Sequence, residues 1–168
     1  MAKQISQITF FITLLVTLLS CTNDTPENNI LLGPTPEANV DYDYTPEELE
    51  VIDLINEYRT SIGLNTLEKI NYVSVKSEEH NNYMISNNVV NHDNFVARSE
   101  DIIKVLGVIK VSENVAYNYK TPLAAVKAWL ASPKHKKNLT GDYTNFGISI
   151  TKNPINGRNY YTNIFVKY

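Results

Sequence analysis

Cysteine is almost missing from this sequence of 168 residues: Cys21 is the only one, so a disulfide bond within the chain is excluded. The motifs that mark common hydrolases are missing as well, since neither Gly-x-Ser-x-Gly nor His-Glu-x-x-His occurs. No apolar stretch beyond the first twenty residues approaches the length that spans a membrane. The folded part must therefore be stabilised by burial alone, and no nucleophile motif assigns it a catalytic class.

The charge balance is mildly acidic, with a formal net charge of −3 at pH 7. Removal of residues 1–20 would make the chain more acidic still, because Lys3 is the only charged residue among them. An acidic chain is a poor match for nucleic acid or for an anionic membrane surface as the main partner. We therefore expect no nucleic-acid partner.

Residues 1–20 have the pattern of a signal peptide, with Lys3 preceding a predominantly apolar run from Ile8 to Leu19. The run ends in Leu18-Leu19-Ser20-Cys21, which resembles a bacterial lipobox, where the cysteine is acylated and becomes the new N-terminus. The alternative is an ordinary secretory signal with an incidental cysteine. We expect Cys21 to be the lipidation site, and the protein to be anchored in the bacterial cell envelope, periplasmic or at the surface.

A change of composition separates this segment from the rest of the chain. Residues 21–44 are rich in Pro, Asn, Asp and Glu, which predicts a disordered tether that starts at the lipidated cysteine. Residues 45–168 then form one domain, because they suffice for a single core and are too few for two.

Local signals predict helices on both sides of a short antiparallel sheet. Thr45-Pro46-Glu47-Glu48 is a capping box that begins a helix, and Gly63 ends it. Further helices are predicted from about residue 67 or 72 to 86, over 99–106, from Thr121-Pro122 to Ser132-Pro133, and as a short turn around 135. Strands are predicted over 110–117, 145–151 and 160–168, the last two joined through Asn156-Gly157. The fold class expected is α+β, a three-layer α-β-α sandwich.

Three short segments carry the chemistry: Asn91-His92, Ser112-Glu113-Asn114-Val115-Ala116, and Trp129 to Asn138 with Ser132-Pro133-Lys134-His135. Two imidazoles and a carboxylate can bind a divalent metal or transfer protons. In this order the segments resemble the CAP superfamily of cysteine-rich secretory proteins, antigen 5 and pathogenesis-related proteins, and its bacterial SCP-like branch most of all. The resemblance covers roughly residues 47–168.

This resemblance implies a CAP fold and a shared cleft of His92, Glu113 and His135, supported by Asn114, Ser132 and Asn138. No cofactor is certain, and Zn²⁺ held by His92 and His135 is the one such a set could take. The family's second glutamate is absent, since Ser132 occupies its place, so a site with two histidines and two glutamates is not expected. His80, in the middle of a predicted helix, is interpreted as structural.

The function expected is the binding of a small ligand, a metal ion or an envelope partner through this cleft. The alternative is a metal-assisted hydrolase of peptide or ester bonds, which the missing second carboxylate weakens. Whether the protein is an enzyme stays open at this stage.

Overall fold

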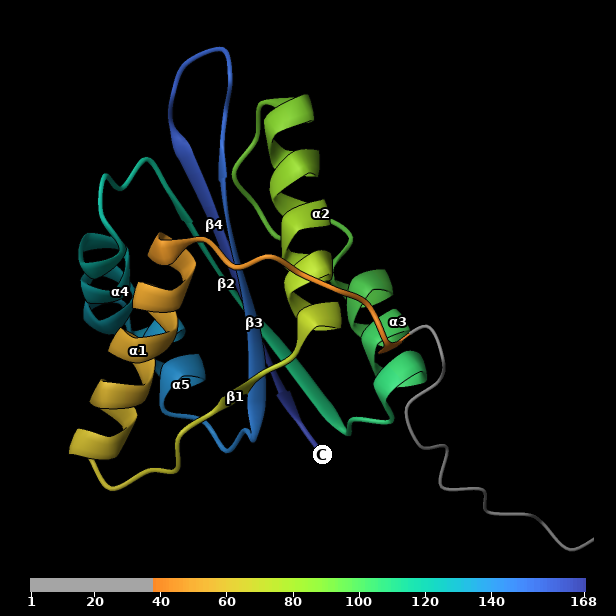
Figure 1. Ribbon diagram of the computed structural model, residues 1–168, viewed down its shortest axis with the longest axis vertical. Coiled ribbons are helices and arrows are strands. Elements are labelled where there is room, and N and C mark those ends of the chain that lie inside the picture. The colour runs from red at the N-terminus through yellow and green to blue at the C-terminus, as the bar shows by residue number, and fades with distance from the viewer. Residues whose placement is uncertain (1–37) are drawn as a thin grey trace, which may run out of the picture. The chain divides into compact units, whose positions relative to one another are not determined.

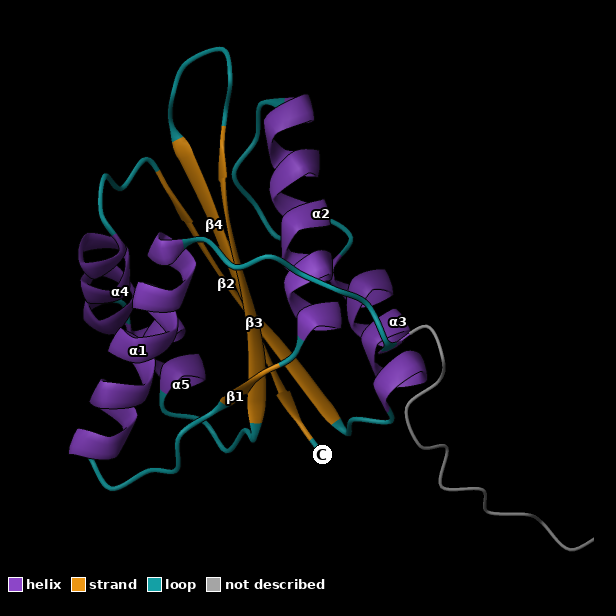
Figure 2. Cartoon of the chain, in the orientation of Figure 1, coloured by secondary structure: helices purple, strands orange, loops and turns teal. Residues whose placement is uncertain are grey.

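The computed structural model describes residues 38–168, so the predicted signal peptide, Cys21 and most of the predicted tether lie outside the described residues. The helices are α1 (Pro46–Ser61), α2 (Asn71–Asn87), α3 (Phe95–Leu106), α4 (Pro122–Ala131) and α5 (Pro133–Leu139). The strands are β1 (Glu68–Lys69), β2 (Lys110–Tyr117), β3 (Asn145–Lys152) and β4 (Asn159–Lys167). Helices α1, α4 and α5 cover one face of the sheet and α2 and α3 the other (Figure 1). Figure 2 shows the same three layers by element type, which confirms the predicted α+β sandwich.

Helix α1 begins where the capping box predicted. The Thr45 side chain accepts from the Glu48 backbone N–H, and the Glu48 carboxylate accepts from the Thr45 N–H in return. Gly63, at φ +76°, takes the left-handed conformation that ends the helix. Val51, Ile55, Tyr58 and Ile62 recur at helical spacing and predict the buried face, but Ile62 is 47% exposed whereas Arg59 is fully buried. The Arg59 guanidinium donates there to the backbone carbonyls of Leu139, at the end of α5, and of Gly141.

The sheet has the strand order β1-β3-β4-β2, with β4 antiparallel to both β3 and β2. The expectation of a purely antiparallel sheet is wrong at one edge, where β1 pairs parallel with β3. A two-residue strand leaves no periodic signal in a sequence, so it could not be predicted. On the α2 side, Gly147 allows close approach, since a Cβ there would lie 2.4 Å from the backbone nitrogen of Ser74.

Apolar side chains fill both interlayer spaces. The helical spacing of Val126, Trp129 and Leu130 predicts a buried stripe on α4, and Trp129 is 1% exposed and packs with α1 and sheet residues. A second cluster, which includes Ile102 of α3 and Ile164 of β4, fills the space beneath α2 and α3. Both faces of the sheet thus bury apolar clusters, and polar side chains such as Asn81 and Thr162 are buried between α2 and the sheet as a hydrogen-bonded pair.

Two predicted boundaries were wrong. Helix α3 begins at Phe95 rather than at Ser99, because Asn94 takes a left-handed conformation there and turns the chain directly into the helix. The domain also begins before Thr45: the Tyr42 hydroxyl donates to Glu48, and Val40 packs against the second apolar cluster. Within residues 38–168, no helix is both long enough and apolar enough to cross a lipid bilayer.

Candidate functional site

The predicted site residues gather around the outer edge of β2, which is the last strand of the sheet. Glu113 and Asn114 lie on this strand, His92 lies in the α2–α3 loop, and His135 and Asn138 lie on α5. Side chains close the open edge of the strand. Asn138 donates to the backbone carbonyl of Glu113 at 3.1 Å, and the Trp129 indole donates to that of Val115 at 3.0 Å. The edge is thereby blocked against pairing with another strand.

The central group is the carboxylate of Glu113, whose side chain is only 1% exposed. Its Oε1 lies 2.8 Å from Nδ1 of His92, and its Oε2 accepts from Nε and Nη2 of Arg98 at 2.9 and 2.6 Å. Both oxygens are therefore engaged in charge-assisted hydrogen bonds. Arg98 also donates to the backbone carbonyl of Asp93, which fixes the His92 loop to α3.

These partners decide the protonation state of Glu113. Burial raises the pKa of this carboxyl, but the His92 hydrogen bond and the positive charge of Arg98 outweigh the burial, so the pKa falls below its ordinary value. Glu113 is an anion at neutral pH, and its charge is balanced within the site.

His92 is the accessible partner, with 52% of its side chain exposed. Its loop leaves α2 through Asn88 and enters α3 through Asn94, both in the left-handed conformation that asparagine tolerates. Because a carboxylate can only accept, Nδ1 carries the proton and the lone pair of the neutral ring is on Nε2. Nε2 is then free to accept a hydrogen bond or to bind a metal ion, with Glu113 orienting the ring.

His80 approaches the same carboxylate from α2 and is 1% exposed. Its Nε2 lies 2.9 Å from the backbone carbonyl of Asn91, so this nitrogen is the protonated one, and 3.7 Å from Oε1 of Glu113. Burial lowers the pKa of His80 despite the nearby Glu113 charge, so the ring is neutral. A buried, neutral ring bonded to the backbone agrees with the structural interpretation.

His135, on α5, lines a different hollow from His92 and Glu113. Its ring lines a hollow of about 320 Å³ with Val90, Tyr117, Tyr119 and Trp129, which we name the His135 hollow. His92 and Glu113 instead line a smaller hollow of about 230 Å³ with Phe95, Ser112 and Asn138, the His92 hollow. Burial lowers the pKa of His135, and the proximity of His92 lowers it further, so the two imidazoles are electrostatic neighbours.

The supporting residues join these two hollows. Asn114 donates to the backbone carbonyl of His135 at 3.1 Å and accepts from Asn138 at 2.8 Å, which ties α5 to β2. Ser132 ends α4 and precedes α5, so it acts as the helix-ending residue that the Ser-Pro pair predicted. The structure thus brings His92 and Glu113 into direct contact and links His135 to them through two asparagines.

A family model, described as the cysteine-rich secretory protein family, matches residues 52–166 of this chain. The chain belongs to the CAP family. It shares 32% identity over 130 residues with YlbC of Bacillus subtilis, described as an uncharacterized membrane protein, and 31% over 105 residues with YkwD of the same organism. These matches cover 73% and 60% of this chain but only 35% and 41% of the relatives, so the chain spans less than half of either relative.

Solved structures carry the same fold. An outer surface protein of Borrelia burgdorferi superposes with a TM-score of 0.66 at 23% identity, over 74% of this chain and 96% of that one. An extracellular protein with an SCP domain from Bacillus anthracis superposes with a TM-score of 0.64 at 23% identity, over 76% of this chain and 45% of that one. At this identity the likeness establishes the CAP architecture.

The CAP-domain residues do not fit a zinc site with three protein ligands. Both oxygens of Glu113 are already bonded to His92 and Arg98, and no group of three or more His, Cys, Asp or Glu within residues 38–168 is placed to hold a metal. His92 and His135 are the two imidazoles that remain. Two nitrogen ligands would hold Zn²⁺ more weakly than the three or four of established sites.

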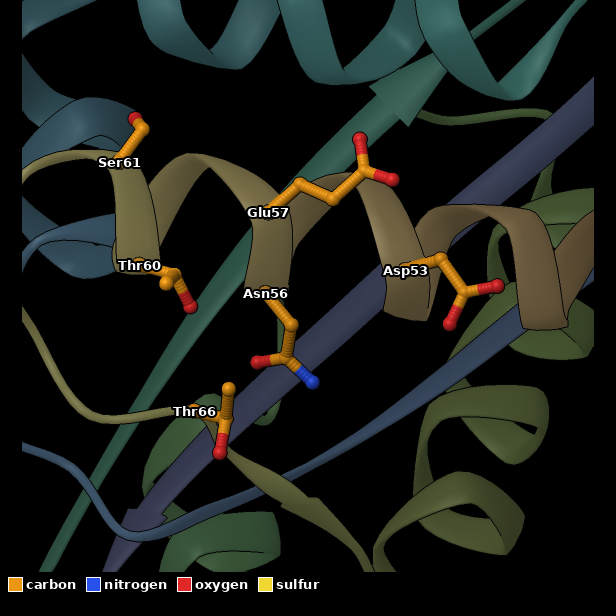
Figure 3. Close-up of a pocket in the computed structure, with 6 residues that line it drawn as sticks. All are labelled: Asp53, Asn56, Glu57, Thr60, Ser61 and Thr66. Carbon is orange, nitrogen blue, oxygen red and sulfur yellow. The ribbon is translucent and has the colours of Figure 1, made fainter.

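A larger hollow of about 530 Å³ lies along α1 and is drawn in Figure 3. Its carboxylates, Asp53 and Glu57, point in different directions and do not converge on a common point (Figure 3). The Asn56 amide is engaged with the backbone of Leu67 as both donor and acceptor. This hollow is a structural feature of the α1–β1 connection and brings no reactive groups together.

Sequence reasoning missed Arg98. It lies outside the three diagnostic segments, in the first turns of a helix whose predicted start was four residues too late. Its role depends on the fold, because α3 brings it to Glu113 across 15 residues of sequence. A cation shortly after the His92 segment was the one available signal.

Proposed function

We propose that this protein is an extracytoplasmic, lipid-anchored CAP-domain protein that binds a small ligand, a metal ion or an envelope partner through His92, Glu113 and His135. One observation supports this most: the buried carboxylate of Glu113 is fully engaged by His92 and Arg98, which leaves Nε2 of a half-exposed imidazole as the open polar atom of the cleft. A carboxylate held in this way positions a ligand-binding group.

A second polar group of the His92 hollow supports binding. Ser112 lines the His92 hollow, and its buried hydroxyl oxygen has no hydrogen-bond partner among the described residues. Buried polar groups normally have partners, so a ligand that bonds to this hydroxyl would remove an energetic cost.

The metal-assisted hydrolase is the second candidate, and the His92–Glu113 pair is the observation that favours it, because a carboxylate-oriented imidazole can serve as a general base. The described residues supply little else for catalysis. Glu113 is not a free carboxylate, Ser132 lines the other hollow, and the zinc ligands are too few. Binding is therefore the function that the geometry supports better.

The anchor rests on Cys21 and the preceding apolar run. The relative YlbC is described as a membrane protein, and the structural relatives are described as an outer surface and an extracellular protein, which agrees with an envelope location. A diacylated Cys21 would hold the domain at a membrane through two acyl chains.

The test is calorimetric titration of Zn²⁺ into the full chain, in a Cys21→Ala background because a free thiol is itself a zinc ligand. His92→Ala and His135→Ala are compared with His80→Gln as the matched control. Weak binding that is lost in the first two variants and kept in the control supports the metal form of the proposal. Equal binding in all four proteins contradicts it.

Hydrolysis is measured on the same proteins with an activated ester and a set of fluorogenic peptides. We expect no turnover above that of His92→Ala. Turnover that depends on both His92 and added Zn²⁺ would favour the hydrolase.

A further inference from the structure

The His135 hollow differs in chemistry from the His92 hollow beside it. Apolar and aromatic side chains form most of its wall: Val90, Val115, Ala116, Tyr117, Tyr119, Ala128 and Trp129. Ser132 and His135 are the only other residues that line it. Its volume, about 320 Å³, is at the lower end of the range for small-molecule sites.

The aromatic wall is held in place by hydrogen bonds. The Trp129 nitrogen is bonded to the Val115 carbonyl, and the Tyr117 hydroxyl accepts from Nη1 of Arg158 at 2.9 Å. The backbone carbonyl of Tyr119 accepts from the Tyr161 hydroxyl. Four polar groups of the wall residues are thus used already, so the hollow presents mainly ring faces and methyl groups.

Cationic side chains lie near this hollow. Arg158 lies over the Tyr117 ring, 5.8 Å from its centre, and Lys134 is close enough to lower the pKa of His135. From Asn114 to Gly141 the sequence has no acidic residue, and all of its lysines are exposed: Lys120, Lys127, Lys134, Lys136 and Lys137. This basic segment belongs to a chain whose net charge is −3.

We propose that the His135 hollow binds a compact aromatic or apolar group that carries an anionic substituent, with Arg158 and Lys134 attracting the charge. The inference rests on the proposed function, because His135 belongs to both, and it names the ligand class: a small amphipathic anion. A compact aromatic ring suits the volume of the hollow, and the faces of the Tyr rings offer stacking contacts.

Other ligand classes fit less well. A sugar needs several polar partners, and the wall offers Ser132, His135 and the Tyr119 hydroxyl. A neutral apolar ligand would make no use of the surrounding cations. Neutral His135, whose pKa burial lowers, adds no charge of its own to the apolar wall.

The experiment uses the only tryptophan of the chain as its reporter, since Trp129 lines the hollow. The probe is 1-anilinonaphthalene-8-sulfonate, whose binding is followed by energy transfer from Trp129 in the full chain. Naphthalene-2-sulfonate and its neutral sulfonamide then compete for the probe. We expect transfer from Trp129, and displacement by the sulfonate at about tenfold lower concentration than by the sulfonamide.

Variants locate the site. Arg158→Gln and Lys134→Gln, both at exposed positions, should each weaken sulfonate binding by up to about fivefold, whereas the matched control Lys104→Gln on α3 should not. Ala128→Phe should block binding by filling the hollow, with circular dichroism as the check on folding. Probe binding without transfer from Trp129, or equal displacement by sulfonate and sulfonamide, would overturn the inference.

The same sulfonate titration, followed by the imidazole NMR signals of His92 and His135, separates the two proposals. Shifts of both imidazoles together with quenching of Trp129 support both. Imidazole shifts without any change at Trp129 overturn the inference but do not contradict the proposed function. Quenching of Trp129 with a shift of His135 alone supports the inference and contradicts a site shared with His92. Quenching with both imidazoles unchanged overturns the inference, because His135 lines the hollow.

Discussion

The indole Nε1 of Trp129 donates to the backbone carbonyl of Val115 at 3.0 Å, two residues along β2 from Glu113. This bond ties α4 to the outer edge of the strand that carries the site carboxylate. Asn138 makes the equivalent connection from α5, at Glu113 itself. The position of the site thus depends on two helices that are packed on the edge of the sheet.

Trp129→Ala should reduce the free energy of unfolding by about 3–5 kcal/mol, because it empties a fully buried core position. With no disulfide in the chain and a typical total of ~5–15 kcal/mol, this loss threatens folding altogether. Urea unfolding measures it. Leu123→Ala, an exposed residue of the same helix, is the control and should change stability by less than about 0.5 kcal/mol. A loss below ~1 kcal/mol for Trp129→Ala would contradict the packing.

Removing one partner of the buried pair of Glu113 and Arg98 should be costly. Glu113→Gln leaves a guanidinium that is only 9% exposed without its counter-charge, at an expected cost of about 3–5 kcal/mol. Asp142→Asn is the matched control, because it breaks an exposed pair with Lys167 and should cost at most ~1 kcal/mol. Similar losses in the two variants, measured by denaturant unfolding, would show that the Glu113 pair is screened by solvent.

Stability should fall on acidification in two stages. The pKa of His80 is below its ordinary value of 6.5, mainly through burial, with Glu113 opposing and Arg98 and His92 adding to the shift. The unfolded chain therefore binds more protons below pH 6.5, and stability declines as the pH falls through that value. The pKa of Glu113 is likewise below 4.5, so a second decline follows under that pH.

Melting temperatures measured between about pH 8 and pH 3 test this order, since they span both ordinary pKa values. His80→Gln, which keeps a side-chain donor and does not titrate, should make the upper stage shallower and leave the lower one. The rest of the upper stage comes from His135, whose pKa burial also lowers. A wild-type protein that gains stability between pH 7 and pH 5 would refute the assignment of His80 as a buried neutral ring.

Anchorage has its own test. Cys21→Ala should move the protein from the membrane fraction to the soluble fraction, or stop its processing, because the acyl chains can no longer be attached. Fractionation and mass measurement of the mature N-terminus report the result. A variant that stays membrane-bound and is processed at the same site would show that the anchor is not at Cys21.

The sequence was most informative where local chemistry decides the structure. Thr45 and Glu48 form the expected capping box, and the alternation from Asn145 onward forms the expected hairpin with β4, because both depend on neighbours in the chain. Strand β1 escaped prediction because two residues carry no period. Ordering of residues 38–44 escaped it too, since it comes from tertiary contacts such as the Tyr42 bond to Glu48.

The site shows the same division. The three segments indicated His92, Glu113 and His135, but they did not indicate that a cation on α3 would balance the charge of Glu113. Arg98 reaches it only because the His92 loop turns at Asn88 and Asn94. A long-range ion pair leaves no periodic pattern in a single sequence. Only the structure therefore shows that Glu113 orients His92 and is not itself a free ligand.

The most direct test of this account is a long-range ¹H–¹⁵N correlation spectrum of the imidazoles at about pH 8, above the ordinary histidine pKa. With three histidines in the chain, each ring can be assigned by single substitution. We predict that His92 carries its proton on Nδ1, held by Glu113, and that His80 carries its proton on Nε2. If His92 is found instead with its proton on Nε2, or with an averaged signal like that of a free imidazole, Glu113 does not orient it and the account is contradicted.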